Sequence, residues 1–243
     1  MSLLIFQHDP HETAGVLGGT LQTYGHRLRI IELFNGHDVP ADLDDVDGIV
    51  SMGGPMNVQD AGEHRWIEPE QTLMRSAHEA GLPIVGICLG AQLLGSALGG
   101  KVEPMDQPEV GFAGVKLAFP GTIDPVMAGI RWDTMQVHAH GQQVTGLPPN
   151  ATPLAGSALC RMQAFRVGMT SYGFQYHFEW DRPAIEKWIG RHCPLVGSAG
   201  LNAADIDRQC DEHYDAYRHV GDRLCDNLAM LLFSVGKRAR LLG

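Results

Sequence analysis

The first half of the chain alternates between short apolar runs and longer segments of helical character. Apolar, β-branched runs predict buried strands at 3–6, 28–34, 48–52 and 83–87. The segments between and after them predict helices at 13–24, 66–79 and 91–98. Strands that alternate with helices form βαβ units, so we expect an open, mostly parallel α/β sheet with helices on both faces.

After Lys101 the pattern changes. Short apolar runs separated by turn residues predict strands at 115–119, 134–137, 151–157, 163–167 and 172–177, so this section is expected to be more antiparallel. A helix is predicted at 182–191 and a longer one at about 204–233. No repeat or linker interrupts the chain, and we expect one domain over 1–243, with about 182–243 as a C-terminal helical extension.

Composition and charge narrow the class of protein. The net charge of −10 and the absence of basic stripes argue against a nucleic-acid or anionic-membrane partner. Five cysteines without a CxxC pair fit a reducing compartment better than a disulfide framework or a zinc knuckle. The amino terminus lacks a basic region and is interpreted as a strand, not a signal peptide. We expect a soluble, cytoplasmic protein.

A single cysteine stands between two glycines where the strand at 83–87 meets the following helix. In the segment GICLG, Gly86 and Gly90 flank Cys88 at minus two and plus two, the pattern of a nucleophile elbow. The start of a helix places unpaired N–H groups and the positive dipole end near the sulfur, which favours the reactive thiolate. A buried structural cysteine at a strand end is the alternative, and this segment alone does not decide between them.

Two further segments supply the groups that such a nucleophile needs. If 174–179 is extended, His177 and Glu179 point to the same side of the sheet, where the imidazole can take the thiol proton and the carboxylate can orient the ring. After the strand at 48–52, the backbone of Gly53 and Gly54 can approach a ligand closely. An N–H group there, together with that of Leu89, would form an oxyanion hole. Each motif also occurs by chance or as an ordinary turn.

Taken together, the GGP turn, the G-x-C-x-G-x-Q elbow and the late H-x-E motif resemble the class I glutamine amidotransferases. Within that family the chain looks most like free-standing proteins similar to the amidotransferase part of GMP synthase. The resemblance covers the chain to about Asp181 and implies a flavodoxin-like fold, a catalytic triad and no cofactor. It implies roles for the following residues: Cys88 as nucleophile, His177 as base, Glu179 as its orienter, Gly54 and Leu89 as oxyanion donors, and Gln92 and Gly53 in substrate binding.

The sequence also departs from the family's usual pattern at Ala91, Tyr176 and Phe178. The departures at Ala91 and Phe178 concern details of the pocket and hence the substrate. The expected reaction is hydrolysis of the glutamine side-chain amide through a cysteine thioester, with ammonia passed to an acceptor or to a separate synthetase subunit. A stand-alone γ-glutamyl peptidase or hydrolase is the alternative with the same chemistry. A binding or regulatory module without turnover is the third interpretation, and the intact triad argues against it.

Several other signals are weaker. The segment 95–102 matches most of a phosphate-binding loop, but Val102 stands where Ser or Thr is needed and the glycines close a helix. His138 and His140 share one strand face and could bind a metal, yet no third ligand is placed by sequence, so no metal site is predicted and a place at the pocket rim is favoured. His8, His11 and Glu12 follow the first strand and either line the site or form a polar loop. Cys193, Cys210 and Cys225 are interpreted as ordinary thiols.

Overall fold

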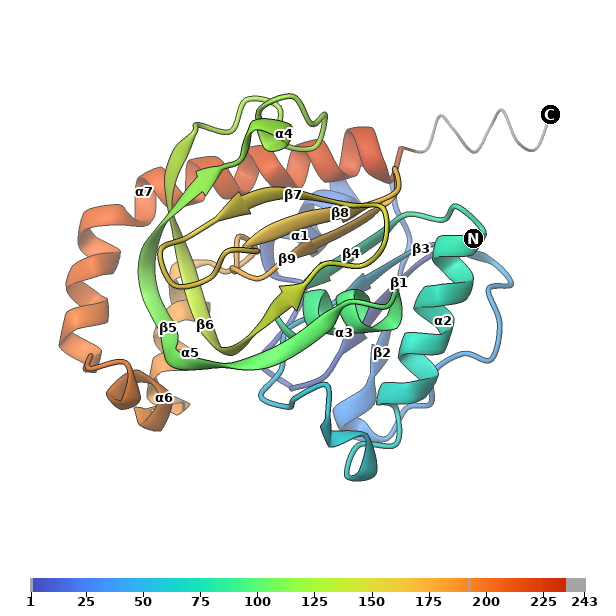
Figure 1. Cartoon of the computed structure of the whole chain (residues 1–243), viewed down its shortest axis with the longest axis horizontal. Helices are drawn as coiled ribbons and strands as arrows, with labels where there is room; N and C mark the ends of the chain where they lie inside the picture. Colours follow the sequence, from blue (N-terminus) through green and yellow to red (C-terminus); the bar gives the residue numbers. More distant parts are fainter. Residues whose placement is uncertain (1, 192, 235–243) are drawn as a thin grey trace.

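A computed structural model describes residues 2–191 and 193–234 of the chain, so the last part of the expected C-terminal extension, 235–243, lies outside the described residues. A nine-stranded sheet forms its centre, in the order β2-β1-β3-β4-β9-β8-β7-β5-β6. Figure 1 shows this sheet with helices packed around it. The strands are β1 (Ser2–Gln7), β2 (Leu28–Glu32), β3 (Val46–Ser51), β4 (Ile84–Ile87), β5 (Lys101–Leu117), β6 (Asp133–Gly146), β7 (Ala151–Gly156), β8 (Ala164–Val167) and β9 (Ser171–Phe174).

The sheet changes direction at β9. The pairs β2-β1, β1-β3, β3-β4 and β4-β9 are parallel. The pairs β9-β8, β8-β7, β7-β5 and β5-β6 are antiparallel. The expected flavodoxin-like α/β fold with an additional antiparallel section is therefore confirmed. The helices are α1 (Gly15–Thr23), α2 (Ile67–Glu79), α3 (Leu89–Ala97), α4 (Phe119–Thr122), α5 (Arg182–Arg191), α6 (Cys193–Ser198) and α7 (Ala203–Asn227), which continues as a π-helical turn (Leu228–Leu232).

Alternation along β1 divides the core between the two faces of the sheet. Leu3 and Ile5 pack in a cluster with residues of α1 and of the C-terminal helix, among them Leu17 and Leu224. Leu4 and Phe6 pack on the opposite face, in a cluster that includes residues of α2 and α3. Successive side chains of a strand point to opposite faces, so the unbroken apolar run from Leu3 to Phe6 in β1 is what a sheet covered on both sides requires. Figure 1 shows α7 running along the molecule beside the sheet.

The sequence interpretation is wrong about the second half of the sheet in one respect. In the region that forms β5, only 115–119 was expected to be a strand. In the structure β5 begins at Lys101 and forms a long hairpin with β6. Pro104 and Pro108 lie within it, and the register of the pair shifts between Pro104 and Glu109. Proline is unusual inside a strand because it cannot donate to the ladder, and irregularities of this kind accommodate it. The short helices α4 and α6 were not predicted either.

A second correction concerns the H-x-E segment. The expected strand at 172–177 ends at Phe174, and His177 lies beyond it, in a bend that makes an isolated bridge to Val137 of β6. The N–H of His177 donates to the carbonyl oxygen of Val137 at 2.8 Å. The position of His177 is therefore fixed by the edge hairpin of the sheet and not by strand alternation.

Among the described residues, no helix combines the length and the apolar character needed to cross a lipid bilayer.

Candidate active site

Cys88 occupies the turn between β4 and α3, as the sequence predicts. Its backbone has a φ of 52° and a ψ of −108°, a conformation that residues with a side chain rarely adopt. Both flanking glycines are needed for this turn. A Cβ atom at Gly86 would collide with the carbonyl oxygen of Gly90, and one at Gly90 would collide with the carbonyl oxygen of Ser51 on β3. The elbow thus packs its backbone directly against the neighbouring strand.

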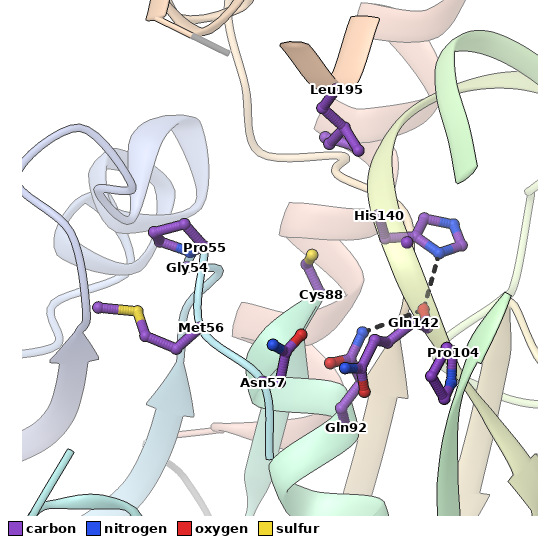
Figure 2. Close-up of a pocket in the computed structure, with 12 residues that line it drawn as sticks. Gly54, Pro55, Met56, Asn57, Cys88, Gln92, Pro104, His140, Gln142 and Leu195 are labelled. Atoms are coloured by element: carbon purple, nitrogen blue, oxygen red, sulfur yellow. Dashed lines mark hydrogen bonds between the residues drawn. The ribbon is translucent and has the colours of Figure 1, made fainter. Parts of the chain in front are cut away.

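The cysteine opens onto a pocket of about 270 Å³ at the carboxyl ends of β3 and β4 (Figure 2). The Cys88 side chain is only 5% exposed, and its sulfur is reached from this pocket. One side is formed by the loop after β3 and the other by β6. The lining residues are Gly54, Pro55, Met56, Asn57, Cys88, Gln92, Pro104, Ala139, His140, Gly141, Gln142 and Leu195. A pocket at this edge is where open parallel sheets bind their ligands.

His177 and Glu179 form a buried pair next to Cys88. The Nδ1 atom of His177 lies 2.7 Å from Oε1 of Glu179, and Oε2 of Glu179 accepts the backbone N–H of Phe178 at 2.9 Å. Trp180 stacks on the imidazole with 3.7 Å between ring centroids. Burial lowers the pKa of His177, but Glu179 and the neighbouring Cys88 outweigh it, so the net pKa is raised well above its usual value. A ring held in this way is ready to keep a proton beside the sulfur.

The other ring nitrogen of His177, Nε2, makes no hydrogen bond of good geometry within the described part of the chain, and the Cys88 thiol is the group beside it. Nδ1 faces a carboxylate, so Nε2 is the nitrogen left to exchange a proton with a nucleophile or a leaving group. Phe178 points away into apolar packing with Phe174 and Tyr176, as the sequence predicts.

The loop Gly53–Gly54 is held by a second buried histidine. His8 lies 2.9 Å from Oε2 of Glu70 through Nε2, and its Nδ1 lies 3.2 Å from the carbonyl oxygen of Gly53. Burial lowers the pKa of His8, but Glu70 and the Gly53 carbonyl reverse this, so the net pKa is raised. A carbonyl oxygen only accepts, so Nδ1 donates to Gly53. In a trans peptide the C=O and the next N–H point in opposite directions. His8 therefore turns the N–H of Gly54 away from itself.

Gly53 and Gly54 are packed differently. Gly54 lines the pocket, and a Cβ atom there would lie 2.9 Å from Cδ2 of Leu89. Gly53 does not line it; a Cβ atom at Gly53 would lie 2.8 Å from Oε2 of Glu12 and 2.9 Å from Cε1 of His177. The absence of a side chain at Gly53 thus lets the loop approach the imidazole.

Gln92 lies on the pocket wall, one turn into α3. Its amide nitrogen donates to the carbonyl oxygen of Gln142 at 3.2 Å (Figure 2). It also donates to Oε1 of Gln175 at 3.2 Å. The side chain is therefore fixed between α3, β6 and the segment that follows β9. Its amide oxygen is the atom left to face a ligand.

Glu12 is a buried carboxyl group that the sequence placed only loosely at the site. It is 5% exposed, and its Oε2 atom has no hydrogen-bond partner among the described residues. Burial is the largest influence and raises the pKa of Glu12 to about 7; Glu179 and Asp9 act in the same direction, against His177 and His8. His11, in contrast, is only partly buried and does not line the pocket.

The raised pKa of Glu12 predicts that the free energy of unfolding depends on pH. The pKa of Glu12 is near 4.5 when the chain is unfolded and about 7 when folded, so the folded state binds the proton more tightly. The stability that this group contributes is fully present below pH 4.5 and is lost as the pH rises through 7. Glutamine does not titrate, so the Glu12→Gln variant should not show this loss. We expect the difference in free energy of unfolding, variant minus wild type, to be larger at pH 8 than at pH 4 by about 3 kcal/mol. Urea unfolding at the two pH values measures this change, and Glu63→Gln, at an exposed position, is the control. If Glu12→Gln changed the free energy of unfolding equally at pH 4 and pH 8, the pKa of Glu12 would not be raised.

Burial dominates the environment of the three other cysteines whose side chains the structure describes, Cys160, Cys210 and Cys225. Burial is the largest influence on each and raises the pKa of Cys160 and Cys225 to about 12 and that of Cys210 to about 11. The interpretation of Cys210 and Cys225 as ordinary thiols agrees with these shifts. The side chain of Cys193 lies outside the described part of the structure.

His138 and His140 lie on β6 and face a residue that the sequence analysis missed. Glu109 of β5 is the cross-strand neighbour of His140, and all three side chains are buried. His140 reaches the pocket, whereas His138 is completely covered. The sequence indicated this cluster only through the H-x-H spacing of His138 and His140. Glu109 could not be found, because the hairpin that brings β5 beside β6 was not predicted.

Comparison with known proteins places this geometry in a family. The family model described as glutamine amidotransferase class-I matches residues 19–184. A glutamine amidotransferase-like protein of Salmonella typhimurium, YfeJ, is 31% identical over 185 residues, covering 75% of this chain and 77% of that protein. The GMP synthase (glutamine-hydrolyzing) of Porphyromonas gingivalis is 33% identical over 184 residues, covering 73% of this chain.

The GMP synthase is a longer protein, and the chain aligns with only 35% of its length. A crystal structure of a glutamine amidotransferase from Methylobacillus flagellatus is similar over 93% of this chain and 94% of its own, with a TM-score of 0.78 and 25% identity. The family match spans most of the chain, the relative from Salmonella matches over most of its own length, and the solved structure shares the fold. The chain therefore belongs to the class-I glutamine amidotransferase family, whose members hydrolyse the side-chain amide of glutamine.

Proposed function

We propose that this protein hydrolyses the side-chain amide of glutamine through a thioester on Cys88. The observation that carries the proposal is the strained elbow, which points one thiol into a pocket beside the buried His177–Glu179 pair. We also propose that 1–243 acts as one amidotransferase-like domain with 182–243 as an extension. The shared packing of Leu224 with Leu3 and Ile5 supports this.

In the first half of the proposed reaction, the Cys88 thiolate attacks the side-chain carbonyl carbon of glutamine, and the carbonyl oxygen becomes an oxyanion. The N–H groups of Gly54 and Leu89 are assigned to this oxyanion. Leu89 opens α3, so its N–H has no acceptor within the helix. His177 then gives its proton to the departing nitrogen, the C–N bond breaks, and ammonia and a γ-glutamyl thioester result.

In the second half, His177 takes a proton from water, and the resulting hydroxide attacks the thioester carbonyl. The C–S bond breaks, which releases glutamate and restores the thiolate and imidazolium. Glu179 stabilises the imidazolium, and Gln92 is assigned to the bound glutamine. Gly53 is assigned an indirect role in substrate binding, because it positions Gly54 and leaves room for the imidazole.

The destination of the ammonia is part of the proposal. The GMP synthase relative extends well beyond the aligned segment, and its name describes glutamine hydrolysis. We propose that this chain passes ammonia to a separate synthetase subunit, and that it acts in the cytoplasm. Free buried thiols at Cys160, Cys210 and Cys225 are consistent with that location.

The reaction is tested by glutamate release from purified protein. We expect hydrolysis of glutamine, and we expect a glutamine-like diazoketone to modify Cys88 alone, as located by mass spectrometry. Cys88→Ser is the matched control and should lose both reactions. Modification chiefly at Cys160, Cys210 or Cys225 would remove the nucleophile assignment. If γ-glutamyl peptides were cleaved and glutamine were not, the protein would be a γ-glutamyl hydrolase instead.

The oxyanion assignment predicts a selective loss of turnover. In Gly54→Val a Cβ atom would lie 2.9 Å from Cδ2 of Leu89 and 3.3 Å from Sδ of Met56, whose side-chain ends can shift, and 3.0 Å from Cβ of His8, which is held in place. The loop and its N–H are therefore expected to move while the fold survives. The loss of one oxyanion donor lowers kcat by roughly 10²- to 10³-fold. Steady-state kinetics measures this, with Gly62→Val as control, since a Cβ atom at Gly62 meets nothing within 4 Å. Near wild-type turnover of Gly54→Val would mean that the donors lie elsewhere.

A further inference from the structure

Three ligand-type side chains converge on one face of the β5–β6 hairpin, beside the pocket. Glu109 on β5 pairs with His140 on β6, and His138 lies two residues away on the same face of β6. One nitrogen or oxygen atom from each lies within 4.8 Å of the others. All three are almost completely buried: Glu109 is 4% exposed, His140 3% and His138 0%.

The hydrogen bond of His140 determines which of its nitrogens carries a proton. Nδ1 lies 3.0 Å from the carbonyl oxygen of Gln142, as the dashed line in Figure 2 shows. A carbonyl oxygen only accepts, so Nδ1 is the protonated nitrogen. In the neutral ring, Nε2 then carries the lone pair, and it lies 3.4 Å from Oε2 of Glu109. A cation between these two atoms, either a proton or a metal ion, would be stabilised by both.

His138 favours the metal ion over the proton. Neither of its ring nitrogens makes a hydrogen bond of good geometry among the described residues, although the side chain is completely buried and the carbonyl oxygen of Ala113 lies nearby. In the neutral imidazole one of the two ring nitrogens carries a lone pair that can bind a metal ion. Its Nδ1 lies 3.7 Å from the same Oε2 of Glu109. A proton on His140 would leave Nδ1 of His138 without a partner on the side of Glu109, at the desolvation cost of an unsatisfied polar group.

The separations agree with coordination of a small cation. Ligands about 2.0–2.2 Å from a tetrahedral zinc ion are about 3.3–3.6 Å apart. The two measured separations, 3.4 and 3.7 Å, are close to this range. Outer groups hold the ligands as in known metal sites: Gln142 holds His140, while Gln163 and Ser157 donate to Oε2 of Glu109 at 2.6 and 3.0 Å.

We propose that Glu109, His138 and His140 bind one divalent transition-metal ion, of the kind that prefers two imidazoles and a carboxylate, such as Zn²⁺. The sequence predicted no metal site because it placed no third ligand, and the hairpin now supplies Glu109. The ion would join β5 to β6 at the pocket wall and would be reached through the pocket, which His140 lines. This proposal does not depend on the reaction assigned to Cys88.

Cobalt titration tests the site. Wild-type protein stripped of metal with a chelator is expected to bind one equivalent of Co²⁺, with visible absorption from nitrogen and oxygen ligands, and Zn²⁺ is expected to displace it. At free metal about 100-fold above the Kd, the thermal midpoint should rise by roughly 5–10 °C. Glu109→Gln, His138→Gln and His140→Gln should each weaken binding by at least about 10-fold. His219→Asn, an exposed histidine on α7, should bind as wild type does.

Two controls keep the result decisive. The titration is repeated in Cys88→Ser, because a thiolate and His177 could also hold cobalt; loss of binding in this variant would place the ion at Cys88 and overturn the proposal. If a substituted variant fails to fold, the wild-type titration still decides. The absence of one-equivalent binding in folded wild-type protein would mean that the cluster holds a proton on His140, and no metal.

Discussion

Replacing His177 with alanine is expected to lower turnover of glutamine by roughly 10⁴- to 10⁶-fold. In the proposed mechanism this imidazole moves a proton in each half of the reaction, and its Nε2 atom is the group left free for that transfer. Glu179→Gln is expected to lose less, up to about 10⁴-fold, because the carboxylate orients the ring and stabilises its charge without moving a proton itself.

The structure explains why Glu179→Gln should still be severe. Both carboxylate oxygens accept, one facing His177 and the other the N–H of Phe178. A carboxamide has a single acceptor oxygen, so it satisfies one of these donors and turns its NH₂ group toward the other. If that group faces Nδ1, the ring takes the tautomer with a proton on Nε2, which cannot accept the proton of the thiol. Glu186→Gln, at an exposed ion pair on α5, is the matched control and should leave turnover unchanged.

A double-mutant cycle separates this arrangement from independent effects. Because Cys88, His177 and Glu179 are proposed to act as a unit, the combined losses should be far smaller than the product of the single losses. Losses that simply multiplied, or a Glu179→Gln variant worse than His177→Ala, would show that another group serves as base. His140, which lines the pocket, and then His138 would be the next candidates.

Gly90→Ala is expected to lower the free energy of unfolding by about 3 kcal/mol. The new Cβ atom would collide with the carbonyl oxygen of Ser51, and it would lie 2.6 Å from both the carbonyl carbon and Oγ of that residue. The carbonyl group is backbone of a central strand, which cannot shift without disturbing β3 and its neighbours, so the full strain of overpacking is expected. Urea unfolding followed by circular dichroism measures the change.

Gly19→Ala is the matched control for this substitution. Gly19 lies on the exposed side of α1, and a Cβ atom there meets nothing within 4 Å. Alanine should stabilise that helix by about 0.5–1 kcal/mol. If Gly90→Ala lowered the stability by less than about 1 kcal/mol, the elbow would be free to move, and the strained geometry of Cys88 would not be imposed by contact with β3.

The parts of the molecule that sequence reasoning located are those coded by short, local signals. The parallel strands follow from apolar runs, and the elbow follows from Gly86 and Gly90 around Cys88. Prolines within β5 hid that strand, because its pairing with β6 overrides a local preference that argues against it. Because this part of β5 was not predicted, Glu109 could not be placed beside His138 and His140.

The approach of His177 to Glu179 was expected for the wrong reason. Strand alternation would have brought the two side chains to one face, whereas a bend held by Val137 does so in the structure. The orientation of the Gly53–Gly54 peptide depends on His8 and Glu70, which are far apart in sequence. Contacts of this kind have no local pattern, so a single sequence could indicate that His8 is near the site but not what it holds.

The order of strands in the sheet has a consequence for how the chain acquires its reactive centre. β4, which leads to Cys88, and β9, which leads to His177, are neighbours in the sheet, yet the whole antiparallel section is inserted between them in the chain. Pairing them requires a long loop to close, and contacts of this type form slowly. During synthesis the thiol therefore emerges well before its base. In the proposed mechanism a nascent chain therefore carries a cysteine without its base, and we expect reactivity to arise only when β9 docks against β4.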